Sequence, residues 1–270
     1  MEQQERCDLG PEIIDTMMKV VQQKFDSSVC DEVLETAWEI MWALCDRVPG
    51  NSRHFLDQRG LEVFLSCKET FPQEKNLMEN MLGLLTVVVA YRTNRPRLMT
   101  SAFVRAMNDL LDPQDGEVNT SYFAAEVVAH LASDGPSAWL TVIPERDLVL
   151  ARLVRGSSSW VMNGLLAYET LIDVIKLLNV EDLECVLWAT KTIASLVDRN
   201  VDRYCPLLTK QGGLKSILTN IKRIQAIMAG KEAGPEQQDW LKQLLIICHQ
   251  IWGTVIGRQV VVEVVTKDLL

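Results

Sequence analysis

The sequence of 270 residues lacks any segment that would carry the chain into or across a membrane. Residues 1–9 are polar and charged and contain no apolar core, so they do not form a secretory signal. No apolar run reaches the length of about 18 residues that a transmembrane helix needs. We therefore expect a protein of the cytoplasm or nucleus that has no membrane partner.

Positive charge is also in short supply. The 27 Lys and Arg residues are outnumbered by 36 Asp and Glu residues, which leaves a net charge of −9. A surface of this sign repels nucleic acids and anionic lipids, so we expect neither as a partner. The charge favours a basic partner or a free amine.

Residues that commonly carry catalysis or bind metals are sparse. The three histidines, His54, His130 and His249, lie on separate predicted helices, which favours packed or surface roles over a triad or zinc site. No phosphate-binding loop, nucleophile elbow, metalloprotease or dinucleotide-binding motif occurs. The seven cysteines are odd in number and show no C-x-x-C spacing, as is typical of reduced thiols. We expect no enzyme activity, metal or cofactor.

Strand signals are weak, and helical periodicity dominates the chain. Helices are predicted at residues 11–23, twice within 36–64, and at 75–91, 103–111, 120–133, 139–154 with Pro144 as a break, 161–178, 182–197, 205–211, 214–228 and 237–256. The valine-rich tail at residues 259–266 is the one exception. It could add an edge strand, extend the last helix or stay frayed.

The helix that carries Trp38 and Trp42 organises the early part of the chain. Asp31 is its predicted N-cap, and Pro49 with the following Gly and Asn ends it. Its apolar face carries Ala37, Ile40, Met41 and Leu44, and the opposite side carries Glu35, Trp38, Glu39, Trp42 and Asp46. The first face is expected in the core. The second lies in solvent or lines a place for a cation, which carboxylates and indoles both attract.

Two segments of the chain resemble each other. FLDQRGL at residues 55–61 and LTKQGGL at residues 208–214 each follow a helix that carries a tryptophan. An apolar residue, polar residues and a glycine before a new helix are the punctuation of armadillo-type repeats of about 40 residues. We predict an all-α, armadillo-like helical-repeat superhelix over residues 1–258, followed by an apolar tail at 259–270.

The order of several sequence blocks carries a resemblance to a known family. SRHFLDQRGLEVF, LGLL, SYFAA with AHL, AYE, and LWA followed by RYCPLLTKQGGL resemble the C-terminal armadillo-like domain of the Zyg-eleven and Zer-one family. The blocks cover most of residues 30–220. The resemblance implies a substrate receptor of a cullin-RING ubiquitin ligase whose armadillo groove reads proteins that begin with glycine.

The resemblance also implies that regions typical of the family are missing from this sequence. Family members carry a cullin- and elongin-binding box and leucine-rich repeats before this domain, whereas this chain begins almost at the armadillo domain. Either the chain is a shortened paralogue or it reaches ligase subunits through another chain, and we do not expect it to recruit a ligase by the family's usual contacts.

The family's amine-binding residues match this sequence only in part. In the family a tryptophan and an aspartate on one helix, with an asparagine and a glutamate on the next inner helix, hold the terminal ammonium. Trp42 and Asp46 match the first pair, while Val87 and Ala90 stand at the positions of the second, and Ala43 replaces another asparagine. Each unsatisfied buried polar contact costs about 1–3 kcal/mol, so we expect glycine-end binding to be weakened or altered.

Two acidic residues are candidates to compensate for the lost polar groups. Glu126 stands where the family has a glycine, and Glu169 stands where it has an arginine. Tyr122 precedes Glu126 by one helical turn on the same face. These residues complete the expected peptide-binding set. The alternative is that the two acidic residues are neutral changes on a surface that no longer has to bind the family's ligand.

Three functions remain open. The first is a peptide or protein-terminus reader of the ubiquitin-conjugation pathway, which would recognise an N-degron. The second is a scaffold or regulatory protein with a vestigial groove, whose contacts lie on the convex face or the tail. The third, an enzyme, requires titratable groups that converge in a cleft.

Overall fold

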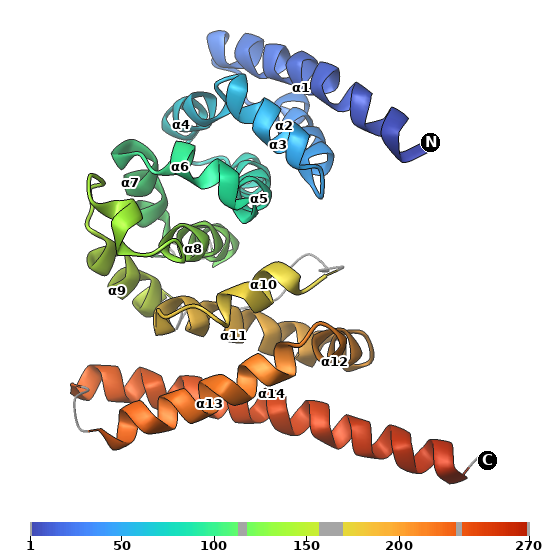
Figure 1. The fold of residues 1–270 in the computed structure, drawn as a ribbon. Coiled ribbons are helices and arrows are strands. Elements are labelled where there is room, and N and C mark those ends of the chain that lie inside the picture. Colours follow the sequence, from blue (N-terminus) through green and yellow to red (C-terminus); the bar gives the residue numbers. More distant parts are fainter. Residues whose placement is uncertain (1, 113–117, 157–169, 231–233, 269–270) are drawn as a thin grey trace. The chain divides into compact units, whose positions relative to one another are not determined.

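The computed structural model describes residues 2–112, 118–156, 170–230 and 234–268 (Figure 1). Regular structure in these residues is helical, and no β-strand occurs among them. The expected all-α fold of armadillo-like packed helices is confirmed. Contacts divide the chain into two compact units, Met1–Val161 and Met162–Leu270, which are described separately.

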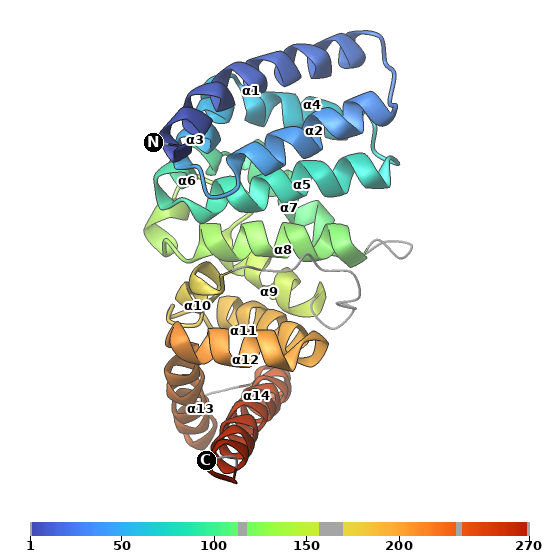
Figure 2. The ribbon, with the colours of Figure 1, turned by 90° about the vertical axis from the view of Figure 1, so that its right-hand side faces the viewer.

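Three helices of the first unit lie side by side. They are α2 (Glu32–Cys45), α5 (Lys75–Ala90) and α8 (Val118–Ala132), and α5 packs against both of the others (Figure 2). We call these three the inner helices of the unit. The helix α1 (Glu2–Asp26) packs against α2. The remaining elements of this unit are α3 (Pro49–Asp57), α4 (Gly60–Thr70), η1 (Arg92–Asn94), α6 (Arg95–Leu98), α7 (Ser101–Leu110), η2 (Pro136–Trp139) and α9 (Arg146–Gly156).

The second unit is built on its last helix. α14 (Pro235–Asp268) packs against α11 (Leu183–Arg199), α12 (Val201–Lys210) and α13 (Gly213–Ala229), and α10 (Ile172–Leu177) packs against α11. Of the three conformations left open for residues 259–266, extension of the last helix is the one observed. The tail at 259–270 is therefore helical through Asp268 and adds no strand there.

Some predicted boundaries differ from the observed helices. The segment predicted at 139–154 forms two elements, η2 and α9, which lie on either side of the predicted break at Pro144. The helix expected at 161–178 is described only from Thr170 onward, where α10 begins at Ile172, and residues 161–169 lie outside the described ranges. α12 begins before the expected Cys205, because the Asn200 side chain accepts a hydrogen bond from the Arg203 amide as its N-cap.

The two similar segments form the same junction between helices. Arg59 and Gly212 adopt left-handed backbone conformations, with φ of 62° and 82°. The next residue begins the following helix, and in both junctions it is a glycine. A Cβ at Gly60 would lie 2.3 Å from the Phe55 ring, and one at Gly213 would lie 2.3 Å from Leu208 Cδ1. The glycine at each junction therefore packs closely against the preceding helix.

The left-handed Arg59 leads to a testable prediction. Glycine adopts this conformation without the penalty that a side chain adds, as Gly212 does at the second junction. Arg59→Gly is expected to stabilise the protein by about 0.5–1 kcal/mol in urea denaturation, after the entropic cost of glycine in the unfolded chain is deducted. Gln58→Gly, at an ordinary φ of −80°, is the control and should destabilise it. Equal effects of the two variants would contradict a conformational cost of the arginine side chain at position 59.

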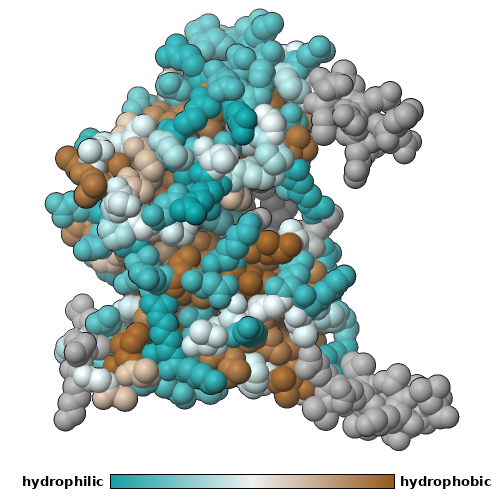
Figure 3. Space-filling view, in the orientation of Figure 1, coloured by the Kyte–Doolittle hydropathy of each residue, from teal (hydrophilic) through white to brown (hydrophobic). Residues whose placement is uncertain are grey.

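No helix among the described residues combines the length and apolar character needed to span a membrane. The surface in Figure 3 mixes hydrophobic and hydrophilic residues. Large exposed apolar side chains do gather in one segment of the first unit, where Leu140, Ile143 and Leu148 are 84%, 62% and 63% exposed. An exposed apolar cluster is typical of a contact surface.

Candidate functional site

The helix α2 forms where it was expected and is capped as expected. The Asp31 side chain accepts a hydrogen bond from the Leu34 amide, and Glu32 and Glu35 lie in the first turn, where negative charge favours the helix dipole. At the other end, Asn51 Nδ2 donates to the Leu44 carbonyl at 2.7 Å. Two neighbouring segments therefore hold both ends of α2 in place.

The expected division of α2 into an apolar and an aromatic–acidic face is wrong for Trp38. This indole is fully buried and meets the Phe55 ring edge to face, with centroids 6.0 Å apart. Ile40 and Leu44, expected in the core, are only partly buried. Because α1 and α5 both pack against α2, the buried arc of this helix is wider than a single face and is displaced toward Trp38.

Trp42 is partly exposed and rests on the neighbouring inner helix. A Cβ at Gly83 would lie 2.5, 2.5 and 2.6 Å from three adjacent carbons of its benzo ring, Cη2, Cζ2 and Cζ3. Nearly equal distances to adjacent carbons place Gly83 against the face of the ring and not its edge. The absent side chain at Gly83 is therefore what allows the indole to lie flat on α5.

The same indole reaches the third inner helix. Trp42 and Phe123 of α8 form an edge-to-face pair, with centroids 6.2 Å apart and planes at 83°. Sequence reasoning missed both Phe123 and the role of Gly83. The signal that could have found them is the repeat itself, since positions 42, 83 and 123 recur about 40 residues apart. Three successive repeats thus fix one ring.

Asp46 follows Trp42 by one turn and ends α2. Its backbone amide donates to the Trp42 carbonyl at 3.0 Å, while its carboxylate is 57% exposed and pairs with the exposed Arg47 at 3.7 Å. A pair this long and exposed contributes little stability. A carboxylate at a helix C-terminus opposes the helix dipole, so its position does not stabilise α2. The group is available to an incoming cation.

Val87 and Ala90 lie on the same helix as Gly83 and are partly exposed. They are spaced by one turn each, so the three residues share one face of α5. The side chains are aliphatic, and the face that continues from the Trp42 contact consequently offers no hydrogen-bond acceptor at these two positions.

The other candidate residues are placed differently. Tyr122 is 2% exposed and pairs edge to face with Phe123, with centroids 6.0 Å apart. Glu126 is 7% exposed and interacts within the protein, so its charge is not presented to solvent. The physical reason is that α8 packs against α5, α7 and α9 and is buried along most of its length. Glu169 lies outside the described residues.

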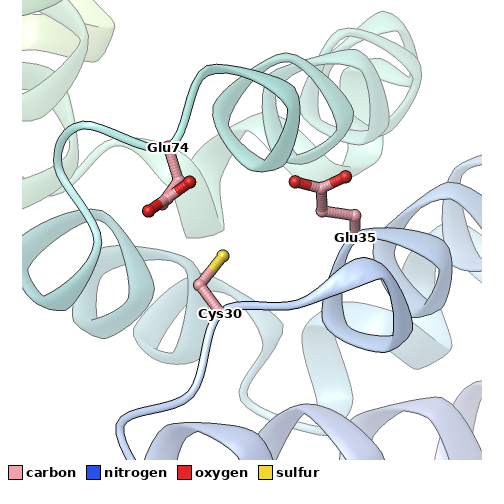
Figure 4. Close-up of side chains that lie close together, drawn as sticks. All are labelled: Cys30, Glu35 and Glu74. Carbon is pink, nitrogen blue, oxygen red and sulfur yellow. The ribbon is translucent and has the colours of Figure 1, made fainter.

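A second group of titratable side chains, one thiol and two carboxylates, lies at the other end of α2. The sulfur of Cys30 and carboxylate oxygens of Glu35 and Glu74 lie within 4.8 Å of one another (Figure 4). Burial, followed by the charges of Glu74, Glu35 and Asp31, raises the pKa of the Cys30 thiol to about 11. The thiol is therefore protonated and unreactive at neutral pH.

This cluster supports a prediction about thiol reactivity. Removing the Glu74 charge lowers the pKa of Cys30, so Glu74→Gln is expected to speed alkylation of Cys30 by iodoacetamide at pH 8 about threefold to tenfold. The gain should disappear above the raised pKa of about 11, where the thiol is ionised in both proteins. Site-resolved mass spectrometry measures the rate, and Glu62→Gln on α4 is the control. A rate unchanged by Glu74→Gln would contradict the electrostatic contribution.

The histidines and cysteines form no further centre among the described side chains. His54, His130 and His249 lie on α3, α8 and α14, as predicted on separate helices. His54 Nε2 is 2.7 Å from Asp15 Oδ1, and His130 is buried against Arg95. Six cysteines are free thiols, and all but Cys30 are buried, namely Cys45, Cys67, Cys185, Cys205 and Cys248.

Comparison with known proteins gives a consistent result. The family described as "Protein zer-1 homolog-like, C-terminal domain" matches residues 1–233. The chain is similar to the protein zer-1 homolog of Homo sapiens, with 36% identity over 221 residues, which cover 80% of this chain and 29% of the relative. It is 32% identical to the zer-1 homolog of Drosophila melanogaster over 75% of this chain and 30% of the relative.

A nematode protein extends the set of relatives. The Zyg eleven-related protein 1 of Caenorhabditis elegans is 30% identical over 74% of this chain and 23% of its own length. The chain thus spans less than a third of the length of these relatives.

Proposed function

Because the chain belongs to the family of the zer-1 homolog-like C-terminal domain, we propose that it is a non-catalytic module that binds the N-terminus of a protein or peptide. It works in the substrate receptor of a cullin-RING ubiquitin ligase. Trp42 and Asp46 are the centre of its binding surface. Recognition of an N-terminal glycine is reduced or altered.

One observation carries this proposal. The Trp42 indole is held by Gly83 and Phe123 but stays partly exposed, and the mainly solvent-exposed carboxylate of Asp46 follows it by one helical turn. An aromatic ring and a carboxylate together attract an ammonium group by quadrupole and by charge. The Asp46 carboxylate contributes little to the fold at this place, since its ion pair is long and exposed.

The missing acceptors support the altered specificity. An N-terminal ammonium carries three N–H groups, each of which needs an acceptor once it leaves water. Val87 and Ala90 supply none, so a glycine end is left with unsatisfied donors that cost about 1–3 kcal/mol each. The module therefore binds an unmodified glycine end more weakly than a site with both acceptors would.

Calorimetry with peptides of one sequence tests the proposal. A free amine end should bind, and the acetylated peptide should not, because acetylation removes the charge. Asp46→Asn should abolish this difference without unfolding the protein, since the side chain is exposed. Binding that is equal for the free and acetylated peptides would disprove amine recognition, and tight binding of the glycine end would disprove the reduced affinity.

A second candidate function has its own observation. The exposed apolar side chains of Leu140, Ile143 and Leu148, which lie close together in the sequence, favour a scaffold that binds partners away from Trp42. Affinity purification separates the two functions. A reader loses its partners on Trp42→Ala, whereas a scaffold keeps them and loses them on Leu140→Ser.

A further inference from the structure

Three side chains that can bind a metal ion converge between the start of α2 and the start of α5. The Cys30 sulfur and carboxylate oxygens of Glu35 and Glu74 lie within 4.8 Å of one another, and Figure 4 shows the three side chains pointing toward a common space. Cys30 lies in the connection between α1 and α2, Glu35 in the first turn of α2, and Glu74 directly before α5. Sequence spacing did not indicate this set, because its members come from separate segments of the chain.

The two carboxylates have no other strong partner among the described residues. Glu74 is the N-cap residue of α5, but its side chain makes no capping hydrogen bond. Glu35 accepts a hydrogen bond from Asn80 Nδ2 at 3.2 Å, but through its backbone carbonyl. The ion pairs of the described residues include neither glutamate, and Lys24 of α1 pairs with Asp31 instead. A cation bound between the two glutamates would therefore displace no ion pair.

The backbone on both sides of Cys30 is held in place. The Val29 amide donates to the Lys24 carbonyl at 3.0 Å and closes the end of α1. The Asp31 side chain caps α2 by accepting a hydrogen bond from the Leu34 amide at 3.1 Å. Both glutamate side chains are at least partly exposed, so they can rotate toward an ion beside the fixed thiol.

The donor set favours zinc. Zn²⁺ binds thiolate sulfur at about 2.3 Å and carboxylate oxygen at about 2.0–2.2 Å, so ligands of a tetrahedral zinc ion lie about 3.3–3.7 Å apart. Small rotations of the two glutamates bring the three donors to this spacing. Mg²⁺ and Ca²⁺ prefer oxygen ligands alone, and Cu(I) prefers sulfur, so one thiolate with two carboxylates favours zinc over these ions.

We propose that Cys30, Glu35 and Glu74 form a zinc site in which water is the fourth ligand. The Cys30 thiol gives its proton to solvent as the sulfur binds the ion, so one proton is released for each zinc bound. The ion offsets most of the negative charge of its three ligands and ties the α1–α2 connection to the start of α5. The site lies at the opposite end of α2 from Asp46, and it does not depend on the proposed function.

Cobalt binding tests the site in the full, reduced chain. Co²⁺ occupies the same kinds of site as zinc, and a thiolate ligand gives it a charge-transfer absorption in the near ultraviolet that oxygen ligands do not. One equivalent of Co²⁺ is expected to produce this absorption. One equivalent of Zn²⁺ should remove it, whereas excess Mg²⁺ should not.

Conservative variants test each ligand separately. Cys30→Ser is expected to abolish the thiolate absorption and to weaken zinc binding in calorimetry at least about a hundredfold, because a serine hydroxyl keeps its proton at neutral pH. Glu35→Gln and Glu74→Gln should each weaken zinc binding at least about tenfold, since an amide oxygen carries no charge. Glu39→Gln removes an exposed carboxylate from α2 and is the matched control, which should bind zinc normally. Circular dichroism checks that each variant folds.

A stability measurement provides a second readout. Zinc should raise the urea midpoint of the unsubstituted protein but not that of Cys30→Ser, because the ligands converge only in the folded chain. Unchanged cobalt absorption in Cys30→Ser would place the metal at another thiol and overturn the proposal. Full zinc affinity in both glutamine variants would leave a single thiol as the ligand and would overturn it as well, as would a failure of excess Co²⁺ to produce the thiolate absorption.

Discussion

Replacing Gly83 by alanine is expected to weaken binding of amine-ended peptides by at least about tenfold while the helical fold persists. The added Cβ would lie 2.5 Å from the Trp42 ring, closer than any Cβ contact in a packed protein. Either the Trp42 indole rotates away from Gly83, or the helices α2 and α5 move apart. Because Trp42 is partly exposed, its rotation is the easier response, and rotation removes the ring from its place beside Asp46.

The stability effect of the same variant is expected to be smaller than its effect on binding. Alanine gains up to about 1 kcal/mol over glycine as a helix former. Overpacking against the indole costs about 1–3 kcal/mol, so a net loss of about 0–2 kcal/mol remains. Urea denaturation measures this loss, and near-ultraviolet circular dichroism reports the changed environment of the tryptophan.

A control and a rescue separate positioning from general damage. Gly253→Ala in α14 has open space for its methyl group, so it should bind normally and be equally or more stable. Adding Trp42→Phe to Gly83→Ala should recover stability, because the smaller ring leaves room for the methyl group, but it should not recover binding. Full binding by Gly83→Ala alone would show that the indole does not take part.

Much of the fold follows from local rules in the sequence. The period of apolar residues predicts helices in the correct places along α2, α5, α8 and α11, and the junction glycines predict the repeats. The tail shows where local propensity is overridden. Its β-branched valines favour a strand, but they directly continue the helical residues of α14, and extending a helix needs no new nucleus.

The site could be predicted only in part, because its geometry depends on contacts between repeats. The positions of Trp42 and Asp46 on α2 follow from the helical wheel. The burial of Trp38 and Glu126 does not, since it depends on how many neighbours cover α2 and α8. The contact between Trp42 and Phe123 joins residues two repeats apart, and it becomes visible only when the inner helices are placed side by side.

The largest loss of stability is expected for Arg95→Ala in the first unit. Arg95 is 7% exposed, and its guanidinium joins the ends of two inner helices. Nε donates to the Val89 carbonyl of α5 at 2.9 Å, and Nη1 donates to Ser133 Oγ and Asp134 Oδ1 beyond α8, each at 2.9 Å. A cation near these helix C-termini also favours both helix dipoles.

Truncation of this side chain leaves several groups without their partner at once. The Asp134 carboxylate is 16% exposed and loses its buried cation, so that only the exposed Arg92 still pairs with it, and the Val89 carbonyl loses its donor. Breaking a buried charged pair from one side costs about 3–5 kcal/mol. Arg95→Lys should lose almost as much, because an ammonium cannot donate to both helices with the geometry of the guanidinium fork.

Arg92 provides a matched control, since it pairs with the same carboxylate from the surface. Its Nε is 3.1 Å from Asp134 Oδ1, but its side chain is 81% exposed, and an exposed pair contributes about 0–1 kcal/mol. Urea denaturation of Arg92→Ala and Arg95→Ala therefore compares two arginines that share one partner and differ in burial. Equal losses would mean that the charge of Asp134 matters and the junction of the helices does not. A loss confined to Arg95→Ala means that the buried fork holds successive repeats together.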